Sequence, residues 1–432
     1  MTPLRIVVLG GGIAGLMAAS AAKRIRVDSE VAIFDEEPLT YKRPALTSII
    51  GGGVKGPEEI LMFPPSYLSS LGIKMQNSVR VTEINAKDNL VKYCDSRGST
   101  KSVSYDRLIL ATGGYAPKPM LEGADKLGVF TLRTFQDALN ISKWARRANS
   151  ATIVGAGFAG LLAAEALVKR GLKVNLIARS RLLRGSLEAD LARSVQSNLQ
   201  RYGVKVFTGT SIEEIDGNNR VKWVETSAGK VYSDLILFAM GVKPRIELAE
   251  AAGVAIEETG IAVNARMQTS IEEIYAAGDC ISVTDTITQR KTYLPIGSLA
   301  AAEGEIAGSN SADEIIESEG FLRAQDEEIF HLQIVSIGCT VENAVEANLR
   351  VEALDATLPS SRRLGKFEEP QVKLVVDAED NLIGAQMVAD KRDLYANSYA
   401  LRLLNFVKER RSLLEVLENL KMPTEPFPST LS

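Results

Sequence analysis

The sequence predicts an α/β protein with two parallel-sheet units of the same design, followed by a C-terminal α+β part. Two observations support the repeated unit: a buried strand, a glycine-rich turn, a helix and a second strand follow Leu4, and the same succession returns after Ala151. A third observation is the change of pattern near Phe321, beyond which no glycine-rich turn of this kind occurs. The elements expected there are strands over residues 331–337, 371–376 and 382–388 and one long amphipathic helix over 393–420.

The first unit is organised around three glycines. The apolar run 6–9 suits a strand that is buried on both faces. Gly10, Gly12 and Gly15 then form G-x-G-x-x-G, in which the first glycine allows a tight turn, the second lets the backbone approach a pyrophosphate and the third lets the helix pack on the strand. The glycines alone also fit a simple glycine-rich turn, and the apolar N-terminal segment fits a secretory signal peptide.

The residues after the glycines decide between these alternatives. A helix that starts at the glycines presents its free N–H groups to phosphates. The second strand, residues 31–34, ends at Asp35, where a carboxylate accepts hydrogen bonds from a ribose 2′-hydroxyl. Strand, helix, strand and acid in this register predict a Rossmann-like dinucleotide-binding domain.

The second unit repeats the motif but ends differently. Its glycines are Gly155, Gly157 and Gly160, and Ala178 occupies the position of the strand-ending acid. Three arginines follow, at 179, 181 and 184. The absence of the carboxylate and the presence of a basic cluster both suit a ribose 2′-phosphate, so we expect NADPH rather than NADH. A solvated basic loop remains the alternative.

Strand ends mark further candidate positions. In an open parallel sheet the ligand lies beyond the carboxyl ends of the strands. Thr112-Gly113 follows one apolar run, Gly241 follows the corresponding run of the second unit, and Gly278-Asp279 follows a third. Asp279 is suited to hold a polyol chain by hydrogen bonds, and a helix that starts near Gly297 would present its N-terminus to a ring system.

Composition excludes several classes of protein. At 432 residues the chain has room for two or three domains, and a net charge of −4 gives no reason to expect nucleic acid as a partner. No apolar run is long enough to span a bilayer. Three cysteines without a C-x-x-C pair argue against a disulfide framework or a zinc site, no metal is expected, and the cytoplasm is the expected compartment.

The motifs GGGIAG, ATGG, GAGFAG, AMGVKP and YAAGDC occur in one order and spacing. In this the chain resembles the pyridine nucleotide–disulfide oxidoreductases, and its last part resembles the coenzyme A-disulfide reductase and NADH oxidase branch. The resemblance implies an FAD domain from residues 1–115 and 245–325, an NAD(P)H domain from 116–244 and a C-terminal dimerisation domain from 326–432. It therefore also implies a homodimer.

The cofactor-binding residues predicted in this way form two groups. Those expected at FAD are Gly10, Gly12, Ile13, Ala14, Gly15, Asp35, Glu36, Arg43, Pro44, Val81, Ala111, Thr112, Gly113, Arg133, Gly278, Asp279 and Gly297. Those expected at NAD(P)H are Gly155, Gly157, Phe158, Ala159, Gly160, Arg179, Arg184 and Gly241.

The chain also departs from the branch that it resembles. Pro44 occupies the position of the redox cysteine, in a segment closer to the Y-x-R-P pattern of ferredoxin and rubredoxin reductases. Ser48 and Leu162 replace a lysine and a glutamate that pair in the ferredoxin and rubredoxin reductases. Met422 replaces the C-terminal acid-base histidine of the pyridine nucleotide–disulfide oxidoreductases. Without a thiolate no mixed disulfide can form at the flavin.

These observations predict an FAD-dependent NAD(P)H oxidoreductase that passes electrons to a non-disulfide acceptor. Because the cofactors carry the chemistry, no side chain is expected to be catalytic. A ferredoxin- or rubredoxin-type protein, oxygen or a quinone each fit as the acceptor. The alternatives are a flavin- and nucleotide-binding redox-sensing interaction protein without efficient turnover, and a disulfide reductase that uses Cys94 or Cys280.

Overall fold

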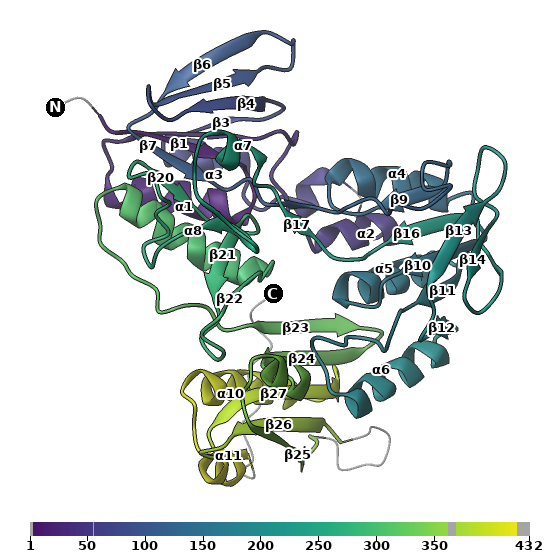
Figure 1. Cartoon of the computed structure of the whole chain (residues 1–432). Helices are drawn as coiled ribbons and strands as arrows, with labels where there is room; N and C mark the ends of the chain where they lie inside the picture. Colours follow the sequence, from purple (N-terminus) through teal and green to yellow (C-terminus); the bar gives the residue numbers. More distant parts are fainter. Residues whose placement is uncertain (1–2, 55, 362–368, 421–432) are drawn as a thin grey trace.

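A computed structural model describes residues 3–54, 56–361 and 369–420 (Figure 1). The first sheet has five parallel strands in the order β20-β7-β1-β2-β3. Its strands are β1 (Arg5–Leu9), β2 (Glu30–Phe34), β3 (Ile73–Gln76), β7 (Arg107–Leu110) and β20 (Ile274–Ala276). The helices beside this sheet are α1 (Ile13–Ile25), α3 (Pro65–Ser70), α7 (Glu247–Ala251) and α8 (Gly297–Ser311). Helix α2 (Ala45–Gly51) instead packs on helices of the second unit (Figure 1), and a 3₁₀ turn at Pro57–Ile60 follows it in the chain.

The second sheet repeats this design with the order β12-β11-β10-β16-β9, again parallel throughout. Its strands are β9 (Val129–Thr131), β10 (Ser150–Val154), β11 (Lys173–Ile177), β12 (Lys205–Phe207) and β16 (Leu235–Phe238). Its helices are α4 (Phe135–Ala145), α5 (Phe158–Lys169) and α6 (Ala189–Arg201). The central strands are apolar and buried because helices cover the sheet.

Short antiparallel sheets extend both units. One comprises β4 (Arg80–Asn85), β5 (Leu90–Cys94) and β6 (Thr100–Ser104); its counterpart comprises β13 (Ile212–Asp216), β14 (Trp223–Thr226) and β15 (Val231–Tyr232). A further small sheet is mixed, because β19 (Gly260–Ala262) and β21 (Ile281–Thr284) pair in parallel, while β18 (Ile256–Glu257) and β22 (Lys291–Thr292) add to it in antiparallel fashion. The two connections between the units pair with each other as β8 (Gly114–Tyr115) and β17 (Lys243–Pro244). The expected limits 115/116 and 244/245 fall at this pair.

The last part is a mixed layer of strands and helices. Its antiparallel sheet has the order β23-β24-β27-β26-β25, and α10 packs on β24 and β27. The bounds are β23 (Ala324–Ile329), β24 (Leu332–Gly338), α9 (Val341–Glu346), β25 (Val351–Thr357), β26 (Gln371–Asp377), β27 (Leu382–Asp390), α10 (Ala396–Lys408) and α11 (Leu413–Leu420). The expected α/β fold with two Rossmann-like units is confirmed.

Two expectations for this part were wrong. The single long helix is two helices, because Arg410 adopts φ +50° and the main chain of Arg411 accepts a hydrogen bond from Leu382 N at 2.8 Å. His331 is not a strand residue: with φ +64° it lies in the turn that joins β23 to β24. The replaced histidine position, Met422, lies outside the described residues.

Helices α1 and α8 touch backbone to backbone. A Cβ atom on Gly304 would collide with the carbonyl oxygen of Ala14, and one on Gly308 with that of Ala18. These glycines therefore let α8 lie against the start of α1, beside the sheet edge formed by β20 (Figure 1). Among the described helices, none has the length and apolarity needed to cross a bilayer.

Candidate functional site

The glycines of the first unit shape a turn between strand and helix. Gly10 has φ +112°, and a Cβ there would collide with the carbonyl of Ala111 at the end of β7. A Cβ on Gly15 would collide with the carbonyl of Gly10. Gly12 differs, since the nearest atom to its Cβ position is Arg43 Nη2 at 4.0 Å. The first and third glycines are thus required by packing, and the second faces open space that a phosphate can enter.

Predicted residues from four distant segments meet beside this turn. Arg43 Nη1 donates a hydrogen bond to the carbonyl of Arg133 at 2.9 Å, and Arg133 forms an ion pair with Asp279 whose side chains are both 13% exposed. Arg133 Nε also donates to the carbonyl of Gly114 at 3.0 Å. Burial lowers the pKa of Arg43 although Asp279 and Glu37 oppose this shift. Pro44 follows Arg43 directly and forms the N-cap of α2.

A cavity of about 500 Å³ lies at the ends of β1 and β2. Desolvation raises the pKa of Asp35, which lies against Gly11 of the turn. The rim carries two ion pairs, from Glu36 to Arg80 at 2.5 Å and to Arg245 at 3.3 Å. Predicted residues that line this cavity are Gly10, Asp35, Glu36, Val81 and Thr112. Ala111 and Gly113 adjoin it, because Ala111 N bonds to Leu9 O and Arg245 N bonds to Gly113 O.

The loop at Gly278-Asp279 is held by groups that the sequence pattern did not identify. Gly278 N donates to the Glu303 carboxylate of α8 at 2.8 Å, and Tyr293 donates to the main-chain carbonyl of Asp279 at 3.2 Å. Gly278 also lies against Ala14 in the first turn of α1. Glu303 is 2% exposed, and desolvation raises its pKa to about 8. Helix α8 begins at Gly297, as expected.

The second unit forms the larger of the two cavities described so far, about 870 Å³. Gly155 and Gly160 are required by packing, because Cβ atoms there would collide with the carbonyls of Ala239 and Gly155. No atom lies within 4 Å of a Cβ position on Gly157. The predicted residues that line the cavity are Gly155, Gly157, Arg179, Arg184 and Gly241. Phe158 and Ala159 form the first turn of α5 behind the glycines.

The three arginines of this cavity have different surroundings. Arg179 is exposed and its side chain makes no hydrogen bond or ion pair with the described residues. Arg181 donates to the carbonyls of Leu187 at 2.5 Å and Arg184 at 3.0 Å, which fixes the loop. Arg184 pairs with Glu342 of α9. Arg179 is therefore the guanidinium most available to a ligand anion.

The thiols are placed unlike redox centres. Cys94 is half-buried on β5, in the outer sheet β4-β5-β6. Cys280 and Cys339 are buried, and desolvation raises their pKa values to about 11 and about 12. A thiol with a raised pKa is a poor nucleophile at neutral pH.

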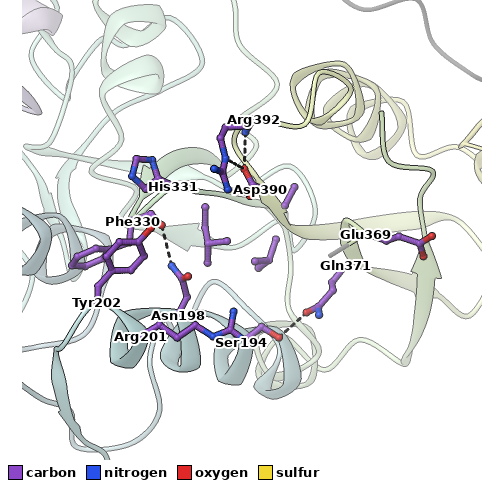
Figure 2. Close-up of a pocket in the computed structure, with 13 residues that line it drawn as sticks. Ser194, Asn198, Arg201, Tyr202, Phe330, His331, Glu369, Gln371, Asp390 and Arg392 are labelled. Atoms are coloured by element: carbon purple, nitrogen blue, oxygen red, sulfur yellow. Dashed lines mark hydrogen bonds and ion pairs between the residues drawn. The ribbon is translucent and has the colours of Figure 1, made fainter. Parts of the chain in front are cut away.

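A third cavity, of about 340 Å³, lies between α6 and the C-terminal sheet, and none of the predicted cofactor residues lines it. Figure 2 shows Tyr202, Phe330 and His331 at one end and Glu369 and Gln371 at the other. Tyr202 stacks on Phe330 with ring centroids 5.0 Å apart. Its basic and acidic side chains are mixed, so it favours no single class of ligand.

The residues present fit two dinucleotides. Each unit offers an open glycine position at a helix N-terminus, which is the arrangement that binds a pyrophosphate. The first unit has Asp35 directly after its second strand, whereas the second unit has Ala178 there, followed by Arg179. No group of histidine, cysteine or carboxylate side chains suited to a metal ion occurs in the described ranges.

The comparisons with known proteins agree with this geometry. Residues 4–303 match the family model described as pyridine nucleotide-disulphide oxidoreductase. An NADH oxidase of Methanocaldococcus jannaschii is 34% identical over 399 residues, which cover 90% of this chain and 88% of the relative. A solved NAD-dependent persulfide reductase of A. fulgidus is 29% identical and superimposes with a TM-score of 0.92, covering 98% of this chain and 80% of that one.

A further solved structure shares the fold at 22% identity, with a TM-score of 0.90 and coverage of 98% of this chain and 94% of that one. It is an engineered water-forming NADPH oxidase bound to NADPH, in which five residues were changed; three of them are consecutive and were changed from aspartate to alanine, alanine to arginine and methionine to serine. These matches place the chain in the pyridine nucleotide–disulphide oxidoreductase family, as an oxidoreductase that uses FAD and NAD(P)H.

Proposed function

We propose that this chain oxidises NADPH and passes the electrons through FAD to a small acceptor that is not a disulfide. The observation that carries the proposal is Pro44, which stands beside Arg43 where a redox cysteine would be required. Bound together, FAD and the nicotinamide supply the hydride chemistry. The alternative of an interaction protein without turnover is not favoured, because the relatives are named as oxidases and reductases.

The roles of the side chains follow from their positions. We propose that residues 1–115 and 245–325 bind FAD, with Asp35 on the ribose, the open Gly12 position at the pyrophosphate and Asp279 on the polyol chain. The ion pair with Arg133 holds the Asp279 carboxylate in place. Residues 116–244 bind NADPH over the open Gly157 position. Binding of the two cofactors in these positions would exclude water and orient the nicotinamide and the flavin.

The acceptor class follows from what the chain lacks at this site. Reduction of a persulfide or disulfide through a mixed disulfide needs a thiolate. Cys280 and Cys339 are buried with raised pKa values, and Cys94 lies on the outer sheet. We therefore place oxygen or a quinone ahead of sulfur compounds. Three free thiols also fit the cytoplasm as the compartment.

NADPH is proposed over NADH on two grounds. Ala178 offers no carboxylate to a 2′-hydroxyl, and Arg179 lines the cavity without a partner among the described residues. Ala178, Arg179 and Ser180 also have the same identities, in the same order, as the three consecutive residues among the five that were introduced into the engineered NADPH oxidase. A guanidinium binds phosphate through charge-assisted hydrogen bonds, which are stronger than neutral ones.

The test is anaerobic stopped-flow absorbance of the flavin-loaded protein mixed with NADPH and, separately, NADH. We expect rapid bleaching with NADPH and slower bleaching with NADH, followed by fast reoxidation when air is admitted. If the reduced flavin reacts slowly with air, it is next mixed with a quinone and, separately, with a ferredoxin-type protein. The oxidant that reoxidises the flavin rapidly is then the class of acceptor. Absence of bleaching with both nucleotides would refute the proposed activity.

We further propose a homodimer formed by residues 326–432. Leu394, Leu401 and Leu414 are large apolar side chains, 65%, 47% and 68% exposed, in the segment that contains α10 and α11. Large apolar side chains left in solvent are covered when two chains associate, so these three leucines are the side chains that we propose to lie in the interface. Multi-angle light scattering at micromolar concentration is expected to give twice the mass of the chain; the mass of a single chain would contradict this proposal.

A further inference from the structure

The loop that contains the arginines, residues 179–188, is tied to the C-terminal sheet. Arg323 Nη1 donates to the carbonyl of Gly185 at 3.0 Å, and the Ser336 hydroxyl donates to the carbonyl of Ser186 at 2.6 Å. Ser336 lies on β24 and Arg323 directly precedes β23, so both donors are about 140 residues or more from the loop in sequence. The shape of the loop therefore depends on that sheet as well as on its own unit.

Glu188 extends this connection to α9. Its main-chain N–H donates to Gln386 Oε1 at 2.5 Å, and its carboxylate accepts from Val341 N at 2.7 Å. Val341 is the first residue of α9, and the Thr340 hydroxyl caps the same helix. The start of α9 is thus fixed beside the loop, together with the side chain that follows Val341.

That next side chain, Glu342, faces two of the arginines. Its Oε1 accepts a hydrogen bond from Arg184 Nε at 2.8 Å, and its Oε2 lies 3.7 Å from Arg181 Nη2. The hydrogen bond from Arg184 lowers the pKa of Glu342, so the carboxylate is charged at neutral pH. Arg181 and Arg184 also line the large cavity of the second unit. The Glu342 carboxylate is therefore already paired with the Arg184 guanidinium, which a ligand phosphate in this cavity would also bind.

We propose that Glu342 is a specificity-determining residue, an internal anion that the 2′-phosphate of NADPH must displace from Arg184. The inference rests on the proposed use of NADPH. Carboxylate and phosphate compete for the same guanidinium fork, and two anions held close together repel each other. Glu342 consequently weakens the binding of NADPH and leaves the binding of NADH unaffected. It thereby reduces the preference for NADPH over NADH that Arg179 creates.

The experiment measures equilibrium binding rather than turnover. Calorimetry on the flavin-loaded protein would give the dissociation constants of 2′,5′-ADP and 5′-AMP, which differ only in the 2′-phosphate. Glu342→Gln removes the charge and keeps the size of the side chain. Because exposed ion pairs are weak, we expect 2′,5′-ADP to bind about two- to fivefold more tightly and 5′-AMP to bind as before.

Glu346→Gln is the matched control. Glu346 is the last residue of α9, one helical turn beyond Glu342, and it forms no ion pair with the loop in the described part of the chain. The control loses the same charge but breaks no ion pair with the loop. Because the Glu346 carboxylate acts on Arg184 only from a distance and less than Glu342 does, the control is expected to change the binding of 2′,5′-ADP less than Glu342→Gln and to leave that of 5′-AMP unchanged. An unchanged flavin spectrum and melting temperature in both variants would verify that they fold.

Each outcome decides the matter. If the unaltered protein prefers 2′,5′-ADP but Glu342→Gln leaves the ratio of the two constants unchanged, the inference fails and the use of NADPH stands. Weaker binding of 2′,5′-ADP by the variant also overturns it, because Glu342 would then orient Arg184 for the phosphate. If neither protein distinguishes the two ligands, both the inference and the preference for NADPH fail.

Discussion

Replacing Arg179 by alanine is expected to raise the KM for NADPH by about tenfold and to leave the KM for NADH nearly unchanged. Arg179 lines the cavity of the second unit, is exposed and makes no hydrogen bond or ion pair with the described residues. Loss of one charge-assisted contact to a phosphate costs about 1.5–3 kcal/mol. The lower end applies here, because Arg181 and Arg184 keep part of the positive potential.

Steady-state kinetics with both nucleotides would measure this effect, and competitive inhibition by 2′,5′-ADP would show whether KM follows binding. Arg193→Ala provides the control, since Arg193 is an exposed arginine on α6 that does not line the cavity. An equal rise of both KM values in the Arg179 variant would contradict the assignment. The rise should also shrink at high ionic strength, because salt screens exposed charges.

The parts of the fold that the sequence predicts are those with local physical causes. Gly10 and Gly155 stand where strand meets helix with φ of +112° and +111°, and side chains there would collide with the neighbouring strand end. Such positions admit glycine and little else, so the motif identifies them without a structure. Continuous apolar runs likewise identified β1, β10 and the strands beside them, because parallel strands are buried on both faces.

The C-terminal part was less predictable because its elements end for tertiary reasons. The helix pattern over 393–420 continues through residues 409–412, and nothing local stops it. There the chain leaves the helix to bond with the turn between β26 and β27, through Leu413 N to Asp380 O at 2.8 Å. Strands β23 and β25 were missed as well, since β23 carries acidic residues that are compatible with a loop.

Contacts between distant segments account for the remaining surprises at the site. Arg184 and Glu342 are 158 positions apart, and a basic cluster in a sequence does not reveal that one member already has an anion. The pair formed by Arg133 and Asp279 is equally remote. Glu303 stands in a helix of mostly small residues whose only charged members are Glu303 and Glu305, and this pattern gives no sign that the Glu303 carboxylate is buried.

Burial of Glu303 leads to the second large effect: Glu303→Gln is expected to stabilise the protein at neutral pH by about 3 kcal/mol. Its pKa is raised from an ordinary value of 4.5 to about 8 by desolvation, and the nearby Asp279 carboxylate acts in the same direction. Between these two values the unfolded chain is ionised at this position and the folded chain is protonated. Unfolding then releases a proton, so stability falls as pH rises from about 4.5 to about 8.

Glutamine keeps an oxygen that accepts the hydrogen bond from Gly278 N and cannot ionise, so the variant should lose this slope. Urea denaturation of the flavin-loaded protein at several pH values would measure the difference between the two proteins, in which all other titrations cancel. The two proteins should be equally stable below pH 4.5 and diverge up to pH 8. Glu305→Gln is the control, because Glu305 lies on the same helix but is exposed and paired with Arg24 at 2.8 Å. If the difference in the free energy of unfolding between the two proteins stayed constant from pH 4.5 to pH 8, Glu303 would ionise alike in the folded and unfolded chains. Gly278 N would then donate to an ionised Glu303 carboxylate rather than to a protonated one.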